Sequence, residues 1–276
     1  METPQIELNN GIRIPQLGFG VFQVPAEDTV DVVLAALHAG YRHIDAAQGY
    51  RNEKEVGDAI ERSGIDPDEI FVTSKLGNAH ITYDDAQRAI DGSLSAIRVK
   101  TPDLFLIHWP LATVRDFMVV WRALEERHAD GTFPAIGVSN FHAPHLERLL
   151  EESDIVPAVN QIEVHPYLTQ QPLRAVNAAH GIVTEAWSPI AQGLVLTDPV
   201  IVEIAQRLGR SPAQVVLRWH VQAGIVVFPK SASPERMAEN LAIFDFELDQ
   251  DDVLRISALN RDERTGGDPD TFRYTW

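Results

Sequence analysis

Four side chains that can take part in acid–base chemistry stand at the ends of short apolar segments. Asp45 ends one segment and Tyr50 lies in the loop behind it, while Lys75 and His108 end the next two segments. A phenol has an ordinary pKa of about 10, so it is a weak acid at neutral pH unless a cation stabilises the phenolate. Lys75 can supply that cation, and a carboxylate at Asp45 would keep the lysine ammonium charged. The set predicts proton transfer from Tyr50 to a carbonyl oxygen that accepts a hydrogen bond from His108.

Each of these residues taken alone also has an ordinary structural explanation. A tyrosine in a loop usually lies on the surface, a lysine after a strand is usually solvated, and a buried histidine is usually a satisfied core residue. Their joint placement at strand ends favours the catalytic interpretation. Because no side chain supplies a hydride, reduction of a carbonyl group also requires a cofactor.

The elements that must position these residues alternate between strand and helix. Short apolar runs are typical of parallel strands buried on both faces, and the rhythm predicts an α/β (β/α)8 TIM barrel with its active site at the carboxyl ends of the strands. The predicted strands are residues 16–20, 41–46, 70–75, 103–108, 135–139, 158–163, 182–187 and 225–229. The predicted helices include Ala26–Ala39, Glu53–Ser63, Tyr83–Ile97, Val114–Ala129, Pro144–Glu151 and Ser211–Ala223.

Both ends of the chain lie outside this alternation. Asn10-Gly11 is a strong two-residue turn signal, so residues 7–14 predict a β-hairpin ahead of the barrel. Residues 261–276 predict a C-terminal loop over the active-site mouth. No linker-like segment divides the chain, and we expect residues 1–276 to form one domain.

Composition excludes several functional classes. The 276 residues include 23 Lys and Arg, 40 Asp and Glu and no cysteine, giving a formal net charge of -17. This charge repels nucleic acid and anionic membranes, and the lack of cysteine excludes disulfides and thiolate chemistry. The first residues do not resemble a signal peptide, so a cytoplasmic location is expected. Gly18-Phe19-Gly20 lacks the rest of a Rossmann fingerprint, and His142 and His145 look like an exposed helix start, so no metal is expected.

An ordered series of motifs runs along the chain. They are Tyr41-Arg-His-Ile-Asp45, Asn52-Glu53, Thr73-Ser-Lys-Leu76, Leu106-Ile-His-Trp-Pro110, Ile136-Gly-Val-Ser-Asn-Phe141, Asn160-Gln161 and Pro229-Lys-Ser231. With this set the chain resembles the aldo-keto reductases from end to end. Segments such as Val216-Leu-Arg-Trp-His220 are most similar to the bacterial 2,5-diketo-D-gluconate reductases.

The resemblance implies NADPH-dependent reduction of aldehydes or ketones, with Asp45, Tyr50, Lys75 and His108 as the catalytic tetrad. It implies that Ser139, Asn140 and Gln161 hold the nicotinamide carboxamide and that Trp187 stacks on the ring. Anion binding is expected near the eighth strand, as is usual in this fold. The residues expected at the adenosine phosphate and adenine are Lys230, Ser231, Arg236, Glu239 and Asn240.

The substrate pocket departs from the pattern of many relatives, which carry Trp where this chain has Gly77. The loss of an indole enlarges the pocket or leaves a gap for loop residues. Small aldehydes, α-dicarbonyls, keto-sugars and aromatic carbonyls all stay open as substrates. The pocket candidates are Phe22, Gln48, Gly77, Trp109, Trp187, Gln192 and residues 272–276.

Two other functions compete with reduction. An aldolase or isomerase would use Lys75 or Lys230 as a Schiff-base amine. A non-catalytic relative would bind the cofactor as a subunit or sensor, although an intact tetrad argues against it. The resemblance also suggests that the protein is a monomer.

Overall fold

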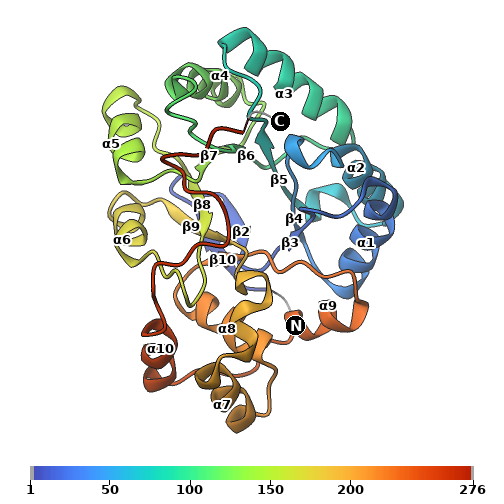
Figure 1. The fold of residues 1–276 in the computed structure, drawn as a ribbon. Helices are drawn as coiled ribbons and strands as arrows, with labels where there is room; N and C mark the ends of the chain where they lie inside the picture. The colour runs from blue at the N-terminus through green and yellow to red at the C-terminus, as the bar shows by residue number, and fades with distance from the viewer. Residues whose placement is uncertain (1–2, 275–276) are drawn as a thin grey trace.

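Eight parallel strands follow one another in chain order in the computed structural model, which describes residues 3–274 (Figure 1). The sheet closes because Leu17, just before the first strand, forms a parallel bridge with Val227 of the last. The predicted α/β barrel is therefore confirmed. The strands are β3 (Phe19–Gly20), β4 (His43–Asp45), β5 (Phe71–Leu76), β6 (Leu104–Ile107), β7 (Ala135–Ser139), β8 (Val159–Glu163), β9 (Val183–Trp187) and β10 (Val226–Val227).

Helices surround the strands on the outside of the barrel (Figure 1). They are α1 (Ala26–Ala39), α2 (Glu53–Arg62), α3 (Tyr83–Ile97), α4 (Phe117–Ala129), α5 (Ala143–Glu152), α6 (Gln171–Ala179), α7 (Pro199–Leu208), α8 (Pro212–Gln222), α9 (Pro234–Leu241) and α10 (Gln250–Ser257). The predicted helices are confirmed with small shifts. α4 starts at Phe117 rather than Val114 because the side chain of Asp116 caps it, accepting a hydrogen bond from Met118 N.

The hairpin ahead of the barrel is confirmed, but its predicted two-residue turn is wrong. Its arms are β1 (Gln5–Glu7) and β2 (Arg13–Pro15), which pair antiparallel. The connection runs over residues 8–12 and is closed by Leu8 N donating to Ile12 O at 2.8 Å, with Gly11 at a φ of +83°. Because the loop is longer than two residues, the paired strands end further from Asn10-Gly11 than a two-residue turn would place them. The hairpin covers the amino-terminal end of the barrel.

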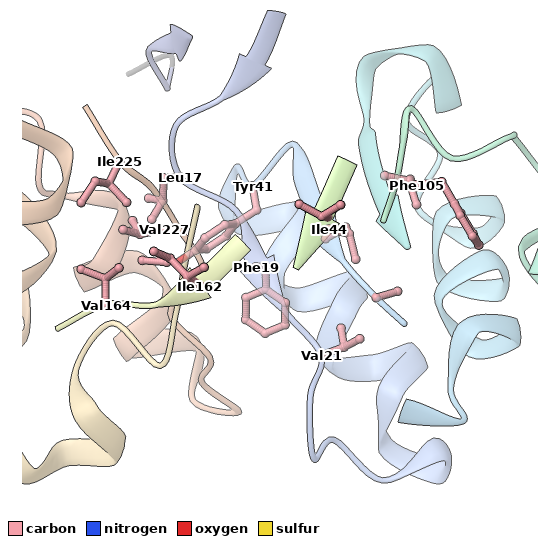
Figure 2. Close-up of a cluster of buried hydrophobic side chains, with 14 of the residues drawn as sticks. Leu17, Phe19, Val21, Tyr41, Ile44, Phe105, Ile162, Val164, Ile225 and Val227 are labelled. Carbon is pink, nitrogen blue, oxygen red and sulfur yellow. The ribbon is translucent and has the colours of Figure 1, made fainter. Parts of the chain in front are cut away.

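Side chains on the outer face of the strands pack against the helices. Figure 2 shows part of this cluster, including Phe19, Tyr41 and Ile44, all fully buried. Because strand side chains alternate between faces, the neighbours of Ile44 on β4 point into the barrel instead. Asp45 is one of them. The outer packing therefore stabilises the fold, while the inner face carries a smaller apolar cluster that includes Leu106 and Val226, together with polar residues such as Asp45.

The chain after α10 crosses the carboxyl end of the barrel without forming a further helix, as predicted (Figure 1, red). Phe272 in this segment stacks on Trp109, with ring centroids 3.8 Å apart. The last predicted pocket positions, 275 and 276, lie outside the described residues. Within residues 3–274, no helix has the length and apolar character needed to cross a membrane.

Candidate active site

The four predicted catalytic side chains meet at the carboxyl ends of three neighbouring strands. Asp45 ends β4, Lys75 lies on β5 and His108 directly follows β6. Tyr50 ends the 3-10 helix η1 (Gln48–Tyr50) in the loop after β4. Lys75 Nζ donates to Asp45 Oδ1 at 2.7 Å and to the Tyr50 hydroxyl at 3.4 Å. The Tyr50 and His108 rings meet edge to face, with centroids 5.6 Å apart.

Local hydrogen bonds turn Tyr50 toward the barrel. Asn52, at the start of α2, is fully buried, and its Nδ2 donates to the carbonyls of Val21 and Val24 at 3.1 Å each. This bond pair ties the loop after β4 to the loop after β3. Phe22 lies in the latter loop, 53% exposed, with its ring centroid 5.1 Å from that of Tyr50. Phe22 therefore stands beside the phenol at the open end of the barrel, and its place in the substrate pocket stays a prediction.

Burial and charge set the protonation states of the tetrad. Burial acts to lower the pKa of Lys75, but Asp45, Tyr50 and Glu185 outweigh it and raise that pKa on balance, so the ammonium stays charged. Burial raises the pKa of Tyr50 to about 12, although Lys75 acts to lower it. Burial also holds the pKa of His108 well below its usual value. At neutral pH the arrangement presents a neutral phenol and a neutral imidazole beside a fixed cation.

Gln48 supports the loop beside Gly77 rather than presenting its polar group to the mouth. Its Oε1 accepts from Gly77 N at 2.6 Å, and its Nε2 donates to Ala89 O on α3 at 2.5 Å. A Cβ added to Gly77 would lie 3.2 Å from Gln48 Oε1. Part of the space beside Gly77 is thus filled by Gln48.

We expect the Gln48→Ala variant to be less stable, because it leaves the amide of Gly77 without its acceptor. The free energy of unfolding should fall by about 1–3 kcal/mol in urea titrations. Gln48→Met, which keeps most of the volume without the hydrogen bonds, should lose nearly as much. Full stability of the Met variant would show that volume alone matters at this position.

The residues predicted to hold the nicotinamide form one connected network across β7, β8 and β9. Ser139 Oγ donates to the Gln161 carbonyl at 2.8 Å. Asn140 Nδ2 donates to the His108 carbonyl at 2.9 Å, and Trp187 Nε1 donates to Asn140 Oδ1 at 2.9 Å. Trp187 is only half-buried at the end of β9. This network links the cofactor residues to the tetrad through His108.

The predicted phosphate-binding residues lie on the loop after β10 and the first turns of α9. Arg236 is exposed, and Lys230 Nζ donates to the carbonyl of Gln23, in the loop after the neighbouring strand β3, at 3.3 Å. Ser231 is buried, with its Oγ accepting from Ser233 N. Glu239 is half-buried, whereas Asn240 is buried near the Tyr41 hydroxyl, which donates to the Met237 carbonyl at 3.3 Å. The cationic pair is thus available to a ligand, and Asn240 contributes mainly to packing under α9.

The other predicted pocket residues surround the mouth unevenly. Trp109 is buried under the ring of Phe272. Gln192 is exposed on the loop after β9, in a left-handed conformation with φ of 54°. The C-terminal segment therefore supplies one aromatic wall, opposite the side formed by Phe22.

Glu163 is a residue that sequence reasoning missed. It is fully buried at the end of β8, and its Oε1 accepts from the amide and hydroxyl of Thr265 at 2.5 and 2.6 Å. Gly266 follows, and a Cβ there would lie 2.3 Å from the Trp187 ring. Glu163 thus anchors the C-terminal segment against Trp187. A carboxylate at the end of an apolar strand was the signal available in the sequence.

His142 also holds the C-terminal segment in place. It is therefore not simply part of an exposed helix start, as the sequence predicted. It is half-buried, with Nδ1 2.9 Å from Asp270 Oδ1 and Nε2 2.9 Å from Arg264 Nη2. A guanidinium only donates, so Nε2 accepts and Nδ1 carries the proton. The imidazole therefore joins α5 to two points of the C-terminal segment.

Comparison with known proteins assigns the family. Residues 16–261 match the model of the Aldo/keto reductase family. The chain is 51% identical over 273 residues to an aldo-keto reductase of Mycolicibacterium smegmatis, covering 99% of both chains, and 46% identical to a glyoxal reductase of Bacillus subtilis, covering 98% of this chain and 97% of the relative. A crystal structure of a Gox0644 mutant in complex with NADPH superposes with a TM-score of 0.95 at 43% identity, covering 99% and 100% of the two chains.

The barrel and the named relatives define a class of oxidoreductases, and the chain belongs to the aldo/keto reductase family. The family predicted from the motifs is confirmed. The relatives are in keeping with the predicted 2,5-diketo-D-gluconate reductase-like subgroup.

Proposed function

We propose that Tyr50 donates the proton when this aldo-keto reductase reduces an aldehyde or ketone to an alcohol with NADPH. NADPH-dependent carbonyl reduction is the reaction of the family to which the chain belongs. The observation that carries the role of Tyr50 is its place 3.4 Å from Lys75 Nζ, which is itself fixed by Asp45 at 2.7 Å. A buried cation beside the hydroxyl stabilises the phenolate that remains after proton transfer.

His108 binds the carbonyl oxygen beside Tyr50 in this proposal. Its low pKa keeps the ring neutral, so one ring nitrogen donates a hydrogen bond and the ring adds no positive charge. As negative charge develops on the oxygen, that hydrogen bond strengthens. The hydroxyl of Tyr50 keeps its proton until the carbonyl oxygen becomes negative, because the pKa of Tyr50 is about 12.

The residues at the ends of β7 to β9 fit the nicotinamide end of NADPH. Ser139, Asn140 and Gln161 place three amide or hydroxyl groups together, and the half-buried Trp187 ring stands beside them. NADPH bound there supplies the hydride. Lys230, Ser231 and Arg236 would hold the 2′-phosphate at the other end, and Glu239 and Asn240 would lie near the adenine.

The charge state of Lys75 disfavours the alternative Schiff-base function. A nucleophilic amine must be neutral, whereas the carboxylate of Asp45 keeps this buried ammonium charged. Lys230 is exposed and lies away from the tetrad, on the loop after β10. Borohydride trapping with a carbonyl substrate should therefore give no lysine adduct, while the same substrate oxidises NADPH.

Small α-dicarbonyls are the first substrates to test, since one relative is a glyoxal reductase and others are methylglyoxal reductases. Oxidation of NADPH should be followed with methylglyoxal, phenylglyoxal, a keto-sugar and a nitrobenzaldehyde. Turnover of the dicarbonyls alone would define the substrate class. Tight NADPH binding without turnover of any carbonyl would favour the sensor or subunit function.

The Arg236→Ala variant should lose affinity for NADPH but not for NADH, because only NADPH carries the 2′-phosphate. A lost charge-assisted hydrogen bond weakens binding by about 10- to 100-fold. Dissociation constants from fluorescence titration of both cofactors check this. Arg255→Ala, which removes a half-buried arginine on α10 that pairs with Glu203 of α7, serves as the control away from this loop. Equal losses for both cofactors would remove Arg236 from this role.

The remaining expectations concern the protein as a whole. Residues 1–276 act as one domain and as a monomer in the cytoplasm, without nucleic acid or membrane partners. The net charge of -17 supports the expectation about nucleic acid. Sedimentation analysis tests the monomer.

A further inference from the structure

Glu185 is a buried carboxyl group inside the barrel that the proposed reaction does not use. It lies in the middle of β9 and is fully buried. In the sheet it pairs with Gln161 of β8 on one side and with Val226 of β10 on the other. Its Oε2 accepts a hydrogen bond from Gln161 Nε2 at 2.8 Å, and its Oε1 is buried without a hydrogen-bond partner among the described residues.

Gln161 joins Glu185 to the catalytic ion pair. The same Nε2 that donates to Glu185 also donates to Asp45 Oδ1 at 2.9 Å, across 116 positions of the chain. An ionised aspartate only accepts, so the nitrogen of the Gln161 amide must face Asp45. Both amide hydrogens are then committed, one to each carboxyl group. The carbonyl oxygen Oε1 of Gln161 is left in a fixed position as the acceptor for a ligand amide.

The surroundings of Glu185 favour its neutral form. The charged groups that face it are Asp45 from β4 and Lys75 from β5, while β8 and β10 present the uncharged Gln161 and Val226. Lys75 and Asp45 already neutralise each other at 2.7 Å. An ionised Glu185 would add an uncompensated negative charge to a buried site, which is costly. A proton on Oε1 would leave the hydrogen bond that Oε2 accepts from Gln161 intact.

We infer that Glu185 is a positioning residue, protonated at neutral pH, that orients the Gln161 amide toward the nicotinamide carboxamide and keeps the barrel interior neutral around Lys75. This inference rests on the proposed cofactor site. Ionisation of Glu185 would also oppose the field of Lys75 at Tyr50, because a nearby carboxylate raises the phenol pKa as Asp45 does. Proton donation by Tyr50 would then weaken.

The sign of the pH effect follows from the burial of Glu185. Burial, together with Asp45, raises the pKa of Glu185 to about 8. The group therefore keeps its proton below this pH and loses it above. The kcat for reduction should therefore fall as pH rises through about 8, whereas affinity for NADPH should change little, because an ionised Glu185 still accepts from Gln161. The pKa of the Tyr50 phenol lies far above that of Glu185, so ionisation of Tyr50 does not contribute to the fall near pH 8.

The first test observes the proton directly in the cofactor-free protein. Infrared difference spectra between wild type and Glu185→Gln at pH 7 should show the carbonyl stretch of a protonated carboxylic acid in wild type alone. That band should disappear above the pKa of Glu185. A carboxylate signal at pH 7 in its place would overturn the inference, whatever the activity of the enzyme.

The second test measures NADPH dissociation constants and kcat against pH for three variants. Glu185→Gln keeps a neutral acceptor for Gln161, so it should match wild type at pH 7 and lose the fall at high pH. Glu185→Leu removes the acceptor, so it should bind NADPH about tenfold more weakly at every pH. Asp103→Asn, which alters a half-buried carboxyl group of raised pKa at the amino-terminal end of the barrel, should keep the wild-type profile.

The outcomes separate the inference from the proposed function. If kcat of the Glu185→Gln variant still fell above about pH 8, Glu185 would not have this role. This conclusion would hold even if the Leu variant failed to fold. Wild-type protein that binds NADPH but reduces no carbonyl would instead contradict the proposed reaction, and the infrared result would still stand on its own.

Discussion

Replacing Tyr50 by Phe is expected to lower kcat for carbonyl reduction by about 10²- to 10⁴-fold, the usual contribution of a general acid. The change removes one oxygen atom and keeps the ring between Phe22 and His108. Stability should change little, because burial of the ring is retained. The dissociation constant for NADPH should stay close to that of wild type, since the hydroxyl contacts Lys75 and not the network of β7 to β9.

Single-turnover reduction and fluorescence titration of NADPH check this expectation together. Phe22→Leu is a suitable control, because it changes the neighbouring ring without touching the acid. It should alter KM for the carbonyl more than kcat. If Tyr50→Phe turned over at the wild-type rate, another group would have to be the proton donor.

Replacing Lys75 by Met should impair both stability and catalysis. The variant leaves Asp45 buried without its counter-ion, and breaking a buried ion pair on one side costs about 3–5 kcal/mol. It also removes the cation beside Tyr50, so kcat should fall by about 10²-fold or more. Urea unfolding and steady-state kinetics measure the two effects separately.

The double variant Asp45→Asn with Lys75→Met separates the structural role of the pair from its catalytic role. It carries no uncompensated charge, so most of the lost stability should return. Reduction should remain slow, because nothing then stabilises the phenolate of Tyr50. Recovery of activity together with stability would show that the pair only maintains the fold.

The barrel, and the convergence of the predicted tetrad residues at its mouth, were predictable from the sequence because their signals are local. Apolar runs separated by amphipathic stretches define parallel strands and helices, and parallel strands bring their carboxyl ends to one mouth. Asp45, Lys75 and His108 stand at such ends in the sequence, so their meeting followed from the fold class. Helix bounds followed equally local rules, as at the Ser211 cap of α8.

Only the tertiary structure decided how these residues are held and protonated. The amide of Gln161 meets Asp45 across 116 positions and Glu185 across 24, and Glu163 meets Thr265 across 102. No local pattern encodes such partners, so the anchor of the C-terminal segment and the bracing role of Gln48 were missed. The composition of β9 shows that a carboxyl group stands in an apolar strand. Whether Glu185 is protonated depends on its burial and on the opposing charges of Asp45 and Lys75, which the closed barrel places around it.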